Sequence, residues 1–490
     1  MSDFGEMTID ELWTEMESAD GFHKGQILLA LFNRKYELEE YGLALAYASE
    51  AAEIFRGTDS QRELGMAQVF MGNCHHAVDA YAEAIECYKN AGVASIGCAT
   101  DHDLAVLQEN LANSLLENLD FEGALKGYEA AETLYLSVDL KVEAARCTLE
   151  AGDIHFQFGR DFEALAAYMR AREQVAGCCD LLKVSKTEAN IAEAYMALGE
   201  YDHALVHARE ALNMAKTCPC PTCINRSQLR LGKALRLVGQ TVAAKEYIQK
   251  SFDSYHENNH PSGQGMCLIE LGNLAIVDEP EKARDYFEQA RSIFTGLDWH
   301  VYRDKSIAGL ATLAANAGDY QSAIELVEEI VTRAKDGMKI GFANANRLTL
   351  AEYHLAHDDP FRAISTLGTL TEVGRITQAE MLRQLSIKAE AYMKLRNWDE
   401  AIAAANEGLD MIIPGDTGAI EGLFHQVRGE CLRHKDPIVA EREYAKAISF
   451  YISDGQVERA EELAKEHFVA PAKLVYDLEL HESTRNKLSQ

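Results

Sequence analysis

The most constraining feature of this sequence is an alanine that returns about every 40 residues. The segments around it are alike, as in DFEGALKGYEAA, DFEALAAYMRAR and EYDHALVHAREA. These marker alanines are Ala44, Ala84, Ala124, Ala164, Ala204, Ala244, Ala283, Ala323, Ala363, Ala401 and Ala440. A fixed period of this length is the signature of stacked supersecondary repeats rather than of separate globular domains.

Other positions keep the same period and indicate two helices in each repeat. A small residue follows the marker by seven positions, and an aromatic residue such as Tyr88 or Tyr128 often follows it by four. Small residues let two helices cross closely, and the aromatic side chain fills the space beside the crossing. Pro280, Pro360 and Pro437 each precede a marker by three positions. Because proline suits the first position of a helix, the second helix of the repeat is expected to begin there.

This pattern resembles the tetratricopeptide repeat in a longer form, with about six extra residues in each repeat. Similar long repeats occur in kinesin light chains, in spindle-orienting adaptor proteins and in bacterial peptide-sensing regulators. The resemblance implies an all-α fold, a right-handed α-solenoid of about eleven helix-turn-helix repeats over residues 21–455. We expect residues 1–20 to form an acidic N-terminal cap, and residues 456–490 a C-terminal capping helix and polar tail, because array ends need polar covers.

The charge and cysteine content restrict the partners and the compartment. The chain has 47 Lys and Arg against 78 Asp and Glu, a formal net charge of −31. Such a surface repels phosphates, so we expect neither nucleic acid nor a membrane as partner. The N-terminus lacks the features of a secretory signal, and no run approaches the ~18 apolar residues of a spanning helix. Its 11 cysteines then indicate a reducing, cytoplasmic location.

A row of asparagines is the first candidate binding feature. Asn33, Asn73 and Asn113 each stand eleven residues before a marker, on the first helix of a repeat. In the fold that the resemblance implies, first helices line the concave face, and an asparagine at this position holds the backbone of an extended peptide. A carboxamide suits that role because it offers both a donor and an acceptor. The alternative is that asparagine is merely tolerated on an exposed helix face.

A row of basic residues is the second candidate. Arg146, Lys186 and Arg226 stand eighteen residues before their markers, 40 residues apart. They could hold carboxylates or phosphates of a ligand. The alternative is that they pair with glutamates of the adjacent helix. The carboxylate clamp of the family is doubtful here, because the asparagine row and the basic row occupy different repeats.

The stretch CPCPTC places Cys218, Cys220 and Cys223 within six residues between two helices. The spacing CxCxxC can supply three ligands to a tetrahedral zinc ion. The fourth ligand could be Cys179, Cys178 or His256, from loops that stacking is expected to bring close. A structural zinc would join two repeats at an edge of the solenoid, away from the groove. A disulfide or redox pair and inert thiols are the other interpretations.

The sequence contains no GxxxxGK[ST] phosphate loop, no GxGxxG after a strand and no HExxH motif. We therefore expect no enzyme activity. The sequence predicts a non-catalytic scaffold or regulator for protein–protein interaction, which binds an extended peptide or partner segment in its concave groove. The alternative is a metal-dependent or redox activity centred on the cysteines of residues 178–223. The pattern identifies neither the partner nor the oligomeric state.

Overall fold

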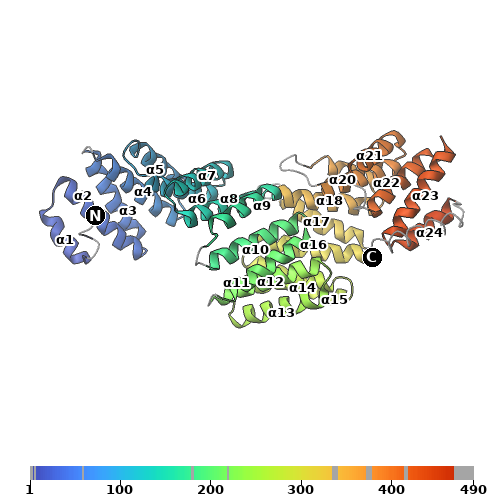
Figure 1. Cartoon of the computed structure of the whole chain (residues 1–490), viewed down its shortest axis with the longest axis horizontal. Coiled ribbons are helices and arrows are strands. Elements are labelled where there is room, and N and C mark those ends of the chain that lie inside the picture. Colours follow the sequence, from blue (N-terminus) through green and yellow to red (C-terminus); the bar gives the residue numbers. More distant parts are fainter. Residues whose placement is uncertain are drawn as a thin grey trace. The chain divides into compact units, whose positions relative to one another are not determined.

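The computed structural model of the chain describes residues 4, 7–57, 60–177, 181–217, 220–333, 340–370, 378–412 and 418–467. These ranges are helical almost throughout, with 24 helices and no strand among them (Figure 1). No helix in these ranges is long and apolar enough to cross a membrane. The prediction of an all-α repeat fold is confirmed.

The even-numbered helices α2 to α22 are the first helices of the repeats. Their bounds are α2 (Gly21–Glu37), α4 (Gln61–Ala77), α6 (Asp101–Glu117), α8 (Lys141–Gln157), α10 (Leu181–Ala197), α12 (Pro221–Leu237), α14 (Pro261–Ala275), α16 (His300–Asn316), α18 (Ile340–Ala356), α20 (Gln378–Lys394) and α22 (Gly418–Leu432).

The odd-numbered helices α3 to α23 are the second helices. Their bounds are α3 (Tyr41–Arg56), α5 (Tyr81–Ala94), α7 (Phe121–Ser137), α9 (Asp161–Gln174), α11 (Tyr201–Ala215), α13 (Thr241–Glu257), α15 (Pro280–Gly296), α17 (Tyr320–Arg333), α19 (Pro360–Leu367), α21 (Trp398–Met411) and α23 (Pro437–Ser453). Outside these eleven repeats stand α1 (Ile9–Ser18), within the predicted N-terminal cap, and α24 (Val457–Glu466), within the predicted C-terminal one.

The period of the sequence is the period of the core. All eleven marker alanines lie on second helices and are buried, ten of them at 0% exposure and Ala440 at 2%. Glycines of the first helix lie against these aromatic residues: a Cβ added to Gly72 would lie 2.5 Å from the ring of Tyr88, and one added to Gly152 would lie 2.6 Å from Tyr168. Only a residue without a side chain allows the first helix to approach the ring so closely.

The turn between the two helices of a repeat contains a backbone conformation that also recurs with the repeat period. Five residues before most markers, the backbone takes a positive φ, as at Gly159, Gly199 and Gly239. Earlier repeats place Asp79 and even Leu119 there, with φ of 60° and 65°. This left-handed residue reverses the chain between the two helices, and glycine adopts it at least cost.

The helices form two compact units, residues 1–156 with 160–238, and residues 239–490 with 157–159. Helices that follow one another pack together, and first helices of neighbouring repeats also make contact. In the first unit α2 contacts α4, α4 contacts α6 and α10 contacts α12; in the second, α14 contacts α16 and α20 contacts both α18 and α22. First helices therefore share one layer in each unit. Both predicted binding rows lie on first helices of the first unit.

Candidate functional site

Two residues of the asparagine row, Asn73 and Asn113, accept hydrogen bonds from other side chains of the protein. The hydroxyl of Tyr88 donates a 2.7 Å hydrogen bond to Oδ1 of Asn73, and Tyr128 donates one of 2.6 Å to Asn113. Each bond joins the second helix of a repeat to the first helix of the same repeat. The side-chain oxygen is thus engaged in both cases, which leaves the amide NH₂ as the group suited to contact a ligand.

Lateral hydrogen bonds connect polar residues of neighbouring first helices, between α4 and α6, between α8 and α10 and between α10 and α12. Asn110 donates to Oδ1 of Asn73 at 3.3 Å. Two repeats later Asn190 donates to Oδ1 of Asp153 at 3.0 Å, and Asp153 also accepts a hydrogen bond of 2.6 Å from Tyr168. We call this set the polar ladder; its members are Asn73, Asn110, Asn113, Glu150, Asp153, Asn190, Glu193 and Arg230. Aspartate and glutamate thus replace asparagine as the ladder proceeds.

The basic row pairs with carboxylates of the preceding repeat. Arg146 lies 2.7 Å from Glu109, and Lys186 lies 3.7 Å from Glu150. The same position further along, Arg383, is bonded to Glu352 and Thr349. The intramolecular pairing considered for this row therefore occurs. It is incomplete, because Arg146 and Lys186 remain 57% and 45% exposed and can still meet a ligand.

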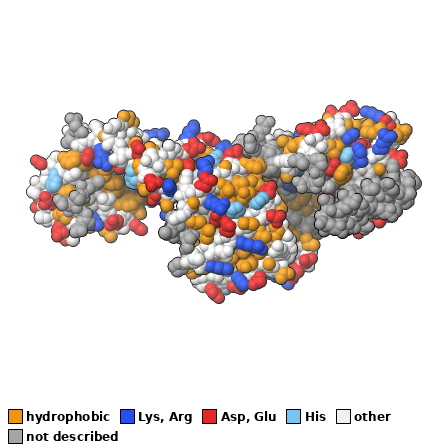
Figure 2. Space-filling view, in the orientation of Figure 1, with side chains coloured by type: hydrophobic (Ala, Val, Ile, Leu, Met, Phe, Trp, Pro, Cys, Tyr) orange, Lys and Arg blue, Asp and Glu red, His pale blue; other side chains and the backbone are white. Residues whose placement is uncertain are grey.

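The structure brings Lys186 and Arg226 together in a cleft of about 250 Å³ between α10 and α12. We call it the cationic cleft; it is lined by Lys183, Ser185, Lys186, Ala189, Cys223, Arg226, Ser227 and Arg230. Four of its eight lining residues carry a positive charge. Arg226 is exposed and forms no ion pair with a carboxylate in the described ranges. Elsewhere acidic and basic side chains are interspersed over the visible surface (Figure 2).

Burial alters the carboxylates of the ladder. It raises the pKa of Glu150 and of Asp153, and this effect outweighs the opposing influence of Lys186 on both groups. Raised carboxyl pKa values show that the ladder is partly withdrawn from water. Charged contacts made beside it are therefore screened less than contacts on an open surface.

Asn33 does not join the cationic cleft. It lines a separate cleft of about 350 Å³ between α2 and α4, together with Gln26, Arg34 and Arg62. The side chain of Phe4 also lines this cleft. Asn33 is exposed, and it shares with Asn73 and Asn113 only its position in the repeat.

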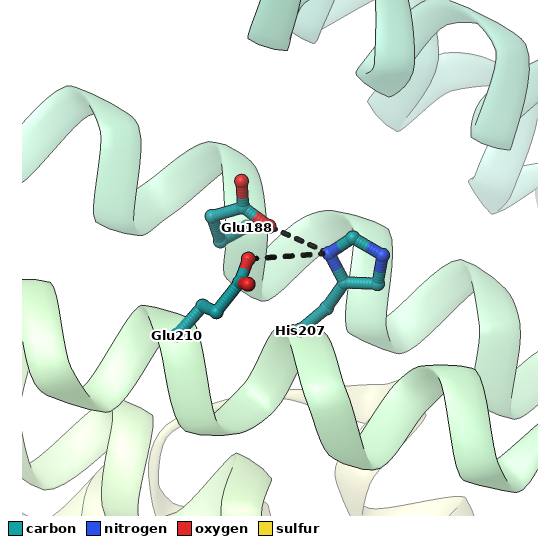
Figure 3. Close-up of side chains that lie close together, drawn as sticks. All are labelled: Glu188, His207 and Glu210. Carbon is teal, nitrogen blue, oxygen red and sulfur yellow. Dashed lines mark hydrogen bonds and ion pairs between the residues drawn. The ribbon is translucent and has the colours of Figure 1, made fainter.

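A buried ion cluster in the same unit escaped the sequence analysis. Glu188 of α10 is 2% exposed and lies 2.9 Å from Arg172 and 2.6 Å from Nδ1 of His207 on α11, with Glu210 4.0 Å from the same nitrogen (Figure 3). In the last repeat, His425 of the first helix bonds Glu443 of the second at 2.7 Å, so the two residue types are exchanged. The sequence shows only a His on one helix and a Glu on another. Predicting that the two side chains meet would have required the geometry with which the helices cross.

The cysteine prediction is resolved only in part. Cys178, Cys179 and Cys218 lie outside the described residues. The Sγ atoms of Cys220 and Cys223 are 2.9 Å apart. Cys223 lines the cationic cleft beside Arg226, because it lies in the first turn of α12. Zinc binding stays a prediction.

No family model matches this chain. Its sequence is similar to regulatory protein RapG of Bacillus subtilis (strain 168), with 23% identity over 290 residues, 58% of this chain and 72% of RapG. Among solved structures, the apo form of RapI superposes with a TM-score of 0.51 at 14% identity, over 56% of this chain and 99% of RapI. The apo quorum sensor NprR from B. thuringiensis gives 0.53 at 12% identity, over 66% of this chain and 91% of NprR. The likeness to these solved structures shows that this chain shares their helical-repeat fold.

Proposed function

We propose that this chain is a non-catalytic regulator or scaffold that binds an extended peptide or partner segment carrying an acidic group. The ligand lies along the polar ladder of α4 to α12, with its acidic group in the cationic cleft. The observation that carries this proposal is that four cations line one cleft, namely Lys183, Lys186, Arg226 and Arg230. They do so on a chain whose net charge is −31.

The ladder supplies contacts to a peptide backbone. At Asn73 and Asn113 the tyrosine hydroxyl fixes the carboxamide, so its NH₂ donates to a peptide carbonyl without loss of side-chain freedom on binding. Because these contacts recur every 40 residues on successive helices, they suit an extended segment rather than a compact ligand.

The cleft supplies affinity for a carboxylate or another anionic group. A charge-assisted hydrogen bond contributes about 1.5–3 kcal/mol when it is sheltered, whereas exposed ion pairs contribute about 0–1 kcal/mol. Arg226 presents a planar fork that binds a carboxylate through two hydrogen bonds. An acidic C-terminus or side chain is therefore the expected anchor, and anionic nucleic acids are disfavoured by the rest of the surface.

The regulatory role is supported by likeness alone: RapG is named a regulatory protein, and NprR a quorum sensor. A cytoplasmic location remains part of the proposal and rests on the cysteine content.

Selection from a displayed library of random peptides tests the proposal. The wild-type chain is expected to enrich extended peptides with an acidic residue or a free C-terminal carboxylate at a constant position. Enrichment of no peptide, or of peptides without an acidic group, would reject it. Repeating the selection at high salt should reduce enrichment, because the charged contacts are screened.

A further inference from the structure

Two thiols meet at the beginning of α12. Cys220 is the N-cap residue and Cys223 is the third residue of the helix, with Pro221 at its first position. The N-cap and the third helical residue are the positions whose side chains face each other in a capping box. This explains why the sulfurs approach to 2.9 Å, with the thiol of Cys223 and that of Cys220 in hydrogen-bond contact.

The pair lies beside a cation, because Cys223 lines the cationic cleft together with Arg226. Both thiols are only partly buried, so an oxidant can reach them. The buried cysteines differ: burial raises the thiol pKa to about 11 for Cys74.

The same holds for the other buried cysteines of the described ranges. Burial raises the thiol pKa to about 12 for Cys147 and Cys267 and to about 11 for Cys431. These thiols remain protonated at neutral pH, which is the less reactive form of cysteine. Of the described cysteines, Cys220 and Cys223 are the pair whose sulfurs lie close enough to join.

We propose that Cys220 and Cys223 form a reversible disulfide by exchange with a low-molecular-weight disulfide. The Cys220 thiolate attacks one sulfur of the oxidant, which breaks the S–S bond and releases one small thiolate that takes up a proton. Cys223 then loses its proton and attacks Sγ of Cys220, and the second small thiol leaves with that proton. Two protein thiols lose two electrons in all, and the small disulfide is reduced to two thiols.

A structural zinc site is the competing interpretation of these two thiols. A structural zinc needs four ligands, and no group of three ligating side chains in the described ranges includes Cys220 or Cys223. The other candidate ligands are His256 and the residues Cys178, Cys179 and Cys218, which lie outside the described ranges. Metal analysis of the protein purified without chelator separates the two cases. One equivalent of zinc that is absent from Cys220→Ser and Cys223→Ser, and that prevents disulfide formation in the wild-type chain, would overturn the proposal.

Redox titration of the full chain in glutathione buffers tests the proposal. After acid quenching, alkylation and proteolysis, mass spectrometry should find a Cys220–Cys223 disulfide that increases with the oxidised fraction and is reversed by reduced glutathione. Absence of this disulfide in the most oxidising buffer, or a bond from Cys218 to Cys220 in its place, would overturn the assignment.

Single variants assign the roles of the two thiols. In Cys223→Ser, the mixed disulfide of Cys220 with glutathione should accumulate, because the second thiol is missing. In Cys220→Ser, neither product should form at Cys223, and equal modification of Cys223 would contradict the assigned roles.

Discussion

The hydroxyl of Tyr128 donates a 2.6 Å hydrogen bond to Oδ1 of Asn113, fifteen residues earlier in the chain. The same bond joins Tyr88 to Asn73 and Tyr168 to Asp153. This position therefore serves the fold through its oxygen, which ties the two helices of a repeat together. Because these oxygens are already bonded, a ligand could contact only the remaining groups. These are the NH₂ groups of the asparagines and the second carboxylate oxygen of Asp153.

Tyr128→Phe removes the hydroxyl and keeps the buried ring. We expect a loss of about 0.5–1.5 kcal/mol in the free energy of unfolding, the usual contribution of one hydrogen bond. Urea unfolding of the full chain, followed by circular dichroism, measures it. Tyr201→Phe is the matched control, since Tyr201 is 38% exposed, and it should leave the midpoint unchanged. An equal effect of the two substitutions would show that the bond to Asn113 contributes nothing.

Gly72→Ala should destabilise the chain, because the new Cβ would lie 2.5 Å from the ring of Tyr88, which is 2% exposed and cannot retreat. Overpacking of this kind costs about 1–3 kcal/mol. Gly92→Ala on α5 is the control, with its nearest neighbouring atom at 3.8 Å. It should stabilise by about 0.5–1 kcal/mol through helix propensity. Thermal unfolding of both variants decides the matter; stabilisation by Gly72→Ala would refute the close crossing.

Asp153→Asn tests the buried charge of the ladder. Burial raises the pKa of Asp153 above its unfolded value, so the folded chain holds this proton more tightly. Stability contributed by the protonated form is then lost as the pH rises through the interval between the two pKa values. Asparagine keeps the bonds from Tyr168 and Asn190 and removes the titration.

The expected result is a higher urea midpoint than wild type at neutral pH, with the difference shrinking as the pH falls from about 7 to about 4. Asp202→Asn, at an exposed position of α11, is the control and should change little. A lower midpoint for Asp153→Asn at neutral pH would mean that the charge stabilises the ladder, contrary to this account.

The repeat fold could be predicted from the sequence because its packing is local and periodic. The marker alanines report a contact that recurs in every repeat, and the glycine–aromatic pairs and the prolines at helix starts mark the same positions in some of them. Pro280, Pro360 and Pro437 do stand at the first position of second helices. The structural role of each such position can therefore be predicted without knowledge of distant parts of the chain.

The site was less accessible because its partners come from neighbouring helices at irregular positions. Periodicity found Lys186 and Arg226 but not Arg230, which occupies another position of the repeat and completes the same cleft. Nor could spacing reveal that the oxygen of Asn113 is already bonded to Tyr128. Pairing of His207 with Glu188 likewise depends on which faces of α10 and α11 meet.

The affinity of a library-selected acidic peptide for Arg226→Glu, compared with Arg209→Glu, tests the central claim most directly. Both substitutions reverse one exposed arginine in the same unit, but Arg226 lines the cationic cleft and Arg209 lies on the second helix α11. Fluorescence anisotropy should show binding weakened by about tenfold or more in Arg226→Glu, since the substitution removes a charge-assisted hydrogen bond of about 1.5–3 kcal/mol and adds a repulsion between like charges. Arg209→Glu should bind as wild type does. Equal affinities for the two variants would contradict peptide binding at this cleft.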